Sequence, residues 1–166
     1  MSGPVDGTPG DPDIMDDSQP RDTPERPGVW IAVDVGTVRV GVARCDPMGV
    51  LAVPVTTLRR NRRDDSDIAE LAALVRQHEA VGVVVGLPRT LGGREGPSVV
   101  MAREYGGKLR TAIAPVSVEY LDERLTTVSA QRKLRDGGVR GPAGRAVIDQ
   151  MAAVEILQHW LDLRRR

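Results

Sequence analysis

The N-terminal half of the chain, from residue 29, alternates short apolar runs with turn residues, a pattern typical of β-strands. Two runs rich in β-branched residues occupy residues 29–35 and 38–45, and Gly36 opens the tight turn between them. A third run covers residues 50–57. Pro54 within it lacks the N–H that a central strand donates, so this strand belongs at a sheet edge. The pattern predicts an antiparallel meander of three strands.

Helical spacing and one long apolar run dominate the rest of the chain. Asp67 and Glu70 form a D-x-x-E pattern that predicts a helix start, and apolar residues follow at helical spacing. The uninterrupted apolar run over residues 81–88 is typical of a strand buried on both faces. Beyond it the pattern predicts a helix, a strand, a short helix and a long helix, over residues 97–112, 115–121, 126–135 and 146–163.

The order of these elements predicts the fold class. Strands that alternate with helices pair in parallel through right-handed crossovers. We therefore expect an α/β domain with a five-stranded mixed sheet, three antiparallel strands followed by two parallel ones, and helices on both faces. In such sheets the reactive crevice lies at the carboxyl ends of strands, where the strand order reverses. Asp34 ends the first expected strand, and Asp122 and Glu123 end the fifth.

Composition divides the 166-residue chain into two parts. Residues 1–27 are rich in Asp, Pro, Gly and Ser and carry a net charge of −5, so we expect a disordered acidic N-terminal tail. Residues 28–166 suffice for one domain with its own core. Their net charge of +5 comes mostly from arginine and is compatible with a nucleic-acid partner without requiring one.

Composition also disfavours several classes of protein. The single cysteine, Cys45, cannot form an internal disulfide and is interpreted as a small apolar strand residue. No apolar run approaches the length of a membrane span, and the N-terminus lacks the pattern of a secretory signal. We therefore expect a cytoplasmic protein with no membrane partner. Two Trp, two Tyr and no Phe argue against a base-stacking platform.

Asp34 is the one charged residue in its apolar run, where burial of a carboxylate is costly unless it is compensated. A hydrogen-bonded turn, an ion pair with a partner such as Arg39, and a bound metal cation are three ways to compensate it. This run alone does not distinguish between them.

Asp149 lies near the middle of the apolar stripe of the last expected helix. With about 100° between successive residues, Ala153, Ile156 and Trp160 all project within about 40° of it. Asp149 is therefore expected to face the sheet, where a carboxylate needs a partner.

Three segments thus each offer a carboxylate that is awkward alone: Asp34, Asp122 or Glu123, and Asp149. If they converge, bare charges so close repel one another, and a divalent cation removes the conflict. Oxygen ligands without His or Cys suit Mg²⁺ or Mn²⁺, and two such ions would activate a water and stabilise the leaving oxygen in phosphodiester cleavage. Simpler roles stay open: Asp149 as a local cap, and residues 122–124 as a salt-bridge cluster.

Arginines flank the same expected edge and are candidate nucleic-acid contacts. They include residues of a glycine-rich loop after the fourth strand and of a flexible basic loop over residues 137–145: Arg39, Arg89, Arg94, Arg124, Arg140 and Arg145. Solvated loop charge explains any one of the loop arginines about equally well. Arg124 is also placed to hold Asp122 instead of a phosphate.

Four motifs, over residues 34–43, 85–88, 122–127 and 149–157, resemble a known family in their order and spacing. They are similar to the signature blocks of the YqgF/RuvX family, over about residues 28–163. The resemblance implies an RNase H-like fold, similar to that of the Holliday-junction resolvase RuvC. Members are described as nucleases that mature the 5′ end of pre-16S rRNA in ribosome biogenesis, and some as resolvases of DNA junctions.

By motif, the resemblance marks Asp34, Glu123 and Asp149 as the catalytic, metal-binding acids, with Asp122 as a neighbouring alternative to Glu123. It implies a metal-dependent endonuclease with pre-rRNA as partner, or branched DNA as the alternative substrate. One feature departs from the wider pattern. RuvC-type nucleases carry a carboxylate at the end of the fourth strand, where this chain has Gly-Leu-Pro at residues 86–88. That departure leaves the number of metals open.

Two other functions stay open. Residues 34–37 also resemble the phosphate motif of sugar- and acetate-kinase-like ATPases, but those proteins duplicate the domain and this chain has room for one copy. The second alternative is a non-catalytic RNA-binding module of ribosome assembly. The sequence does not distinguish a monomer from a homodimer.

Overall fold

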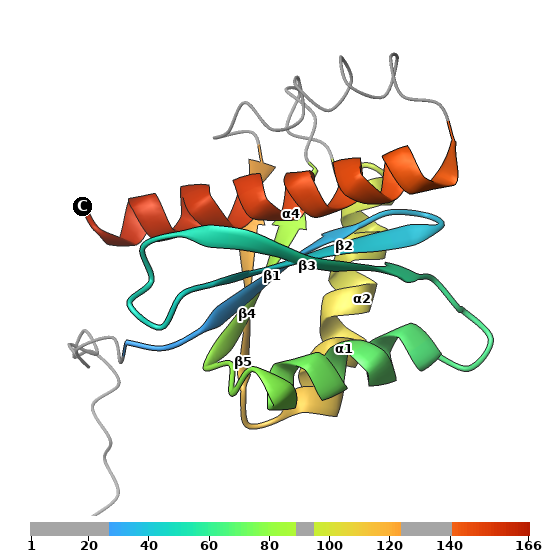
Figure 1. The fold of residues 1–166 in the computed structure, drawn as a ribbon. Helices are drawn as coiled ribbons and strands as arrows, with labels where there is room; N and C mark the ends of the chain where they lie inside the picture. The colour runs from blue at the N-terminus through green and yellow to red at the C-terminus, as the bar shows by residue number, and fades with distance from the viewer. Residues whose placement is uncertain (1–26, 89–94, 124–140) are drawn as a thin grey trace, which may run out of the picture.

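The structure is a computed structural model that describes residues 27–88, 95–123 and 141–166. Five strands form one sheet, and three helices within the described ranges pack on it (Figure 1). The strands are β1 Trp30–Val35, β2 Arg39–Cys45, β3 Ala52–Arg59, β4 Gly82–Leu87 and β5 Ser117–Asp122. The helices are α1 Ser66–Gln77, α2 Pro97–Ile113 and α4 Pro142–Arg164. The short helix expected over residues 126–135 lies outside the described residues, as does the expected tail apart from Pro27.

The sheet has the strand order β3-β2-β1-β4-β5. Strand β1 pairs antiparallel with β2 and parallel with β4, β2 pairs antiparallel with β3, and β4 pairs parallel with β5. The predicted mixed sheet is therefore confirmed, and the proline-containing strand lies at its edge. Because the chain leaves β1 toward one edge and returns to its other side at β4, the strand order reverses at β1.

The β1–β2 turn is as tight as the sequence predicts. The Gly36 N–H donates to the carbonyl oxygen of Arg39 at 2.8 Å. A Cβ atom at Gly36 would lie only 2.7 Å from that same oxygen, so no side chain fits there. Glycine is therefore required for close approach of the two strands at this turn.

Helix α4 covers one face of the sheet, and α1 with α2 covers the other (Figure 1). Successive side chains of β1 point to opposite faces of the sheet and so join both cores. Ala32 packs with Ile156 and Leu157 of α4, whereas Ile31 and Val33 pack in the core that α1 and α2 cover. Helix α4 is 23 residues long. Even so, no helix among the described residues is apolar enough over a sufficient length to cross a lipid bilayer.

Among the element boundaries that differ from the expectation, two have a clear local reason. The third strand begins at Ala52 instead of residue 50, because the Asp46 carboxylate accepts the N–H groups of Val50 at 2.9 Å and Leu51 at 2.6 Å. These bonds draw both residues into the turn. The last helix begins at Pro142 instead of residue 146, since proline is well suited to the first turn of a helix.

The expected role of Asp67 as a helix start is wrong. Helix α1 begins at Ser66, and its N-cap residue is Asp65, which makes no side-chain cap bond. Asp67 is inside the first turn and buried, and its Oδ1 accepts the backbone N–H of Asn61 at 3.2 Å. The D-x-x-E pattern identified the right helix but assigned the wrong task to its first acid.

Candidate active site

Two acidic side chains are buried on the α4 face of the sheet, at the carboxyl ends of β1 and β5. Asp34 is 5 % exposed and shares this face with Ala32 and Trp30, which precede it on alternate positions of β1. Glu123 directly follows β5 and is 1 % exposed. Carboxylates at this depth need strong compensation. The buried pair is therefore the leading candidate for a functional site.

A glycine of the intervening strand makes room for Glu123. A Cβ atom at Gly86 in β4 would lie 2.5 Å from Oε1 of Glu123 and 2.6 Å from Cδ1 of Ile156. Gly86 is also the neighbour of Asp34 across the sheet, because the parallel ladder pairs Val33 with Val85, the residue before each. The Glu123 carboxylate therefore extends over β4 toward the strand that carries Asp34.

A second glycine on the other side of Asp34 admits helix α4. Asp34 is paired with Gly41 in the antiparallel ladder, and a Cβ atom at Gly41 would overlap the backbone carbonyl of Asp149. The α4 backbone thus rests directly on β2 at this point. The expectation that Asp149 faces the sheet is confirmed, and the same close contact puts its helix turn beside β1.

The Asp149 carboxylate is bound by Arg39 at the start of β2. Nε of Arg39 donates to Oδ2 of Asp149 at 2.8 Å, and the two side chains are 28 % and 23 % exposed. Solvent screens a pair this open, so we expect it to contribute about 1 kcal/mol or less. Asp149 is therefore held in place by a contact weak enough to be exchanged for another.

The donor chemistry of this face suits a hard divalent cation, because its acids offer only oxygen. Within residues 27–88, 95–123 and 141–166, no three His, Cys, Asp or Glu side chains gather closely enough to hold a metal ion. Asp34 and Glu123 form the buried part of the expected set, and Asp149 points its carboxylate at Arg39. A site that holds a metal with all three acids would need the Asp149 carboxylate to lie closer to the other two.

The structure separates the two adjacent candidates at the end of β5. Leu121 packs against α4, and Tyr120 packs on the α2 side, so strand alternation puts Asp122 on the α2 side as well. Glu123 lies over Gly86 on the α4 side. Of the two acids, Glu123 shares the face of Asp34.

Among the predicted phosphate contacts, the structure describes two. Arg39 lies beside Asp149, as above, and Arg145 is exposed. Arg145 belongs to the first turn of α4, where its N–H donates to the Gly141 carbonyl at 3.2 Å, so its expected place in a flexible loop is wrong. Four further candidates lie outside the described residues: Arg89, Arg94, Arg124 and Arg140.

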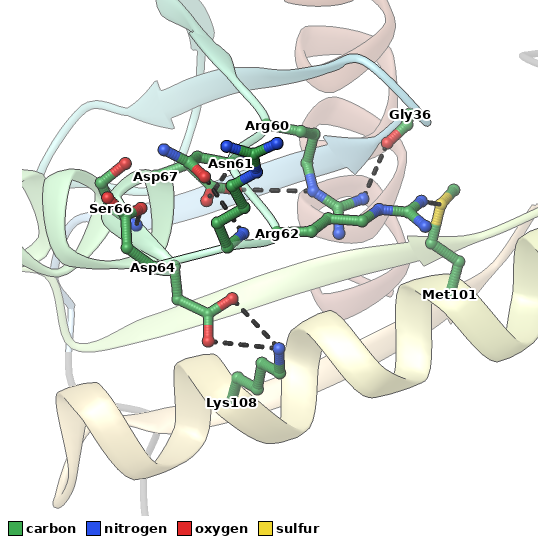
Figure 2. A network of polar contacts seen from close by, with 11 residues as sticks. Gly36, Arg60, Asn61, Arg62, Asp64, Ser66, Asp67, Met101 and Lys108 are labelled. Atoms are coloured by element: carbon green, nitrogen blue, oxygen red, sulfur yellow. Dashed lines mark hydrogen bonds and ion pairs between the residues drawn. The ribbon is translucent and has the colours of Figure 1, made fainter.

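Sequence reasoning missed a polar cluster on the opposite face of the same sheet edge. Arg60, which the sequence shows only as part of a basic loop, extends to the carbonyl of Gly36 in the β1–β2 turn (Figure 2). Asp67 of α1 and Tyr105 of α2 flank its guanidinium. The sequence contains one sign of this cluster: Asp67 is an acid on the otherwise apolar face of its helix.

A family model of known proteins matches residues 28–163, and its description is "RuvX: Holliday junction resolvase". The chain belongs to the RuvX family. The motifs in the sequence thus identified the family correctly. The match begins two residues before β1 and stops one residue before the end of α4.

Close relatives of this RuvX-family chain share about half of its residues. A protein of Mycobacterium sp. (strain KMS) is 56 % identical over 158 residues, which cover 91 % of this chain and 93 % of the relative. One from Frankia casuarinae is 58 % identical over 137 residues, covering 82 % of this chain and 68 % of the relative. Both bear the name "Putative pre-16S rRNA nuclease".

Solved structures of RuvC confirm the predicted RNase H-like fold of the family member. RuvC of T. thermophilus in complex with a Holliday junction substrate matches with a TM-score of 0.53 at 12 % identity, covering 83 % of this chain and 96 % of RuvC. A second Thermus thermophilus RuvC structure matches with a TM-score of 0.51 at 13 % identity and covers 82 % of this chain and 96 % of RuvC. At such identities the likeness concerns the fold.

Proposed function

We propose that this chain is a metal-dependent endonuclease that hydrolyses phosphodiester bonds of pre-16S rRNA during maturation of its 5′ end. The observation that carries the proposal is the burial of Asp34 and Glu123 on one face, at the edge where the strand order reverses. The choice of pre-16S rRNA as substrate is supported by the name that close relatives bear.

Asp34 and Glu123 would hold a divalent cation, Mg²⁺ or Mn²⁺, and Asp149 would join them on release from Arg39. When bound, such an ion supplies an activated water and stabilises the leaving oxygen of the scissile phosphodiester. The chain itself fixes the two buried acids at the carboxyl ends of two strands. Gly36 makes the tight turn beside Asp34, in which the Arg39 carbonyl fills the place that a Cβ would take.

The surrounding arginines would bind the phosphate backbone of the substrate. Arg39 and Arg145 are the described members of this group. Once Asp149 turns away, the Arg39 guanidinium is placed to receive a phosphate close to the acids. The four arginines of the remaining segments, Arg89, Arg94, Arg124 and Arg140, complete the predicted nucleic-acid contacts.

The test uses the purified chain with Mg²⁺, Mn²⁺ or neither, and a 5′-labelled pre-16S rRNA fragment beside a four-way DNA junction. We expect metal-dependent cleavage of the RNA near the mature 5′ end. Asp34→Asn should abolish the cleavage, whereas Glu70→Gln, which neutralises an exposed acid of α1, should not. Equal cleavage by wild type and Asp34→Asn would contradict the proposal.

Junction resolution is the second candidate, favoured by the description of the matching family model. A resolvase needs a two-fold dimer to make paired cuts. Symmetric cleavage of the junction together with an intact pre-rRNA fragment would replace the first function by the second. Sedimentation of the chain with and without the junction would then show whether a dimer makes the cuts.

A further inference from the structure

The β1–β2 turn is held by a side chain on the face of the sheet opposite the candidate active site. Nη1 of Arg60 donates to the carbonyl oxygen of Gly36 at 2.9 Å, and the backbone N–H of Arg60 donates to the carbonyl of Val38 at 2.8 Å. Arg60, the residue that follows β3, thus binds both ends of the turn. Gly36 is two residues beyond Asp34, so the same grip fixes the end of the strand that carries the acid.

Arg60 is itself immobilised by both helices of the opposite layer. Its Nε lies 3.5 Å from Oδ2 of Asp67 on α1, and its guanidinium carbon lies 5.1 Å from the ring centroid of Tyr105 on α2. The Arg60 and Asp67 side chains are 12 % and 3 % exposed, and Tyr105 is buried. Figure 2 shows Arg60 lying between Asp67 and Gly36. The planar fork of arginine allows one side chain to meet a carboxylate, a ring face and a carbonyl at once.

From this geometry we propose that Arg60 is a positioning residue of the nuclease, which sets the place of Asp34 by anchoring the Gly36 carbonyl to Asp67 and Tyr105. The inference rests on the proposed function of Asp34. Arg60 is nearly buried and lies on the face opposite the candidate acids, so we expect it to act on the rate of the chemical step and not on binding. Misplacement of a reacting group by about 1 Å can cost about 100-fold in rate, so a modest shift of this turn is enough to matter.

The decisive variant is Arg60→Lys, which keeps the charge beside Asp67 but loses the fork that also reaches Gly36. We expect kcat on the pre-rRNA fragment to fall by about 10-fold to 100-fold while KM stays within about threefold. Arg60→Met should lower kcat at least as far and also lower the melting temperature. Arg62→Met is the matched control, because it removes the same charge from the same loop and contacts Met101 instead of the turn. Its kcat should equal that of the wild type.

A readout without substrate keeps the two proposals apart. Amide NMR of the metal-free chain should show the Gly36 and Thr37 N–H groups shifted and more mobile in Arg60→Lys, and unchanged in Arg62→Met. If the wild type cleaves no nucleic acid, the proposed function fails while the NMR result still decides whether Arg60 holds the turn.

If Arg60→Met does not fold, Arg60→Lys carries the whole test. Wild-type kcat in Arg60→Lys, with only a lower melting temperature, would mean that Arg60 merely stabilises the fold and would overturn the inference.

Discussion

Two buried aspartates at the same end of the sheet, on opposite faces, have been given different surroundings. Asp67 on the α1 and α2 side contacts two groups: the Arg60 guanidinium at 3.5 Å and the backbone N–H of Asn61 at 3.2 Å. Asp34 on the α4 side has glycine as its neighbour on both adjacent strands, Gly41 and Gly86. Asp67 is thus tied to groups that hold the fold together, whereas the spaces beside Asp34 are taken up by the other candidate acids of the site.

The glycines on the α4 side are occupied by parts of the candidate site itself. The backbone of Asp149 rests on Gly41, and the carboxylate of Glu123 lies over Gly86. This gives a physical reason for the missing acid at the end of the fourth strand. A side chain at residue 86 would take the space that Glu123 uses, so the acid of β5 replaces the one expected from β4.

The largest expected effect separates Glu123 from its neighbour Asp122. Because only Glu123 shares the face of Asp34, Glu123→Gln should reduce the cleavage rate by about 10²-fold to 10³-fold. Asp122→Asn should retain activity within a few-fold. Single-turnover cleavage of the pre-rRNA fragment measures both. A larger loss in Asp122→Asn would reverse the assignment of the two acids.

The next effect concerns stability on the opposite face. Asp67→Asn leaves Arg60 nearly buried without its counter-ion, and we expect a loss of about 3 kcal/mol in the free energy of unfolding. Urea denaturation measures it. The control is Asp65→Asn, which breaks an exposed pair with Lys108 and should cost about 1 kcal/mol or less. Equal losses in the two variants would show that the burial of Asp67 has no energetic weight.

A smaller effect tests the room that glycine provides. Gly86→Ala places a methyl group 2.5 Å from Oε1 of Glu123, so we expect about 2 kcal/mol of destabilisation from overpacking together with a loss of cleavage. Gly107→Ala in α2 meets no atom within 4 Å and should instead stabilise the helix by up to about 1 kcal/mol. Thermal unfolding of both variants, read beside their activity, checks the contrast.

The smallest effect is a pH dependence at the β2–β3 turn. The N–H groups of Leu51 and Val50 lower the pKa of the Asp46 carboxyl below its ordinary value. A carboxyl with a lowered pKa in the folded state contributes stability above its unfolded pKa of about 3.9 and loses it as the pH falls through the folded value. Asp46→Ala should therefore lower the melting temperature at pH 7 by more than at pH 2.5. A constant difference between the two proteins across that range would disprove this origin.

Much of the fold could be predicted because its signals are local. Gly36, Pro54 and the apolar run of β4 each specify a turn, an edge or a buried strand from a few neighbouring residues. Asp34 and Asp149 were found in the same way, since each is a charge within an apolar pattern, whereas Asp122 and Glu123 were found at the end of an expected strand. The order and spacing of the sequence motifs then pointed to the family, and the family match agrees with them.

The remaining features depend on contacts between distant parts of the chain. Whether Asp122 or Glu123 faces Asp34 is decided by the residue at which β5 ends, and a slip of one residue exchanges the two faces. The grip of Arg60 on Gly36 joins residues 24 positions apart, and that of Arg39 on Asp149 joins residues 110 apart. No periodicity within a single element contains such information.

The close contact between Gly41 and the Asp149 backbone has a consequence for synthesis of the protein. Strands β1 and β2 leave the ribosome well before α4, which closes the face on which Asp34 lies. A growing chain therefore holds an exposed β1–β2 hairpin that carries Asp34 until α4 emerges. Because contacts this distant in sequence form slowly, the face that carries the candidate acids closes only after α4 has left the ribosome.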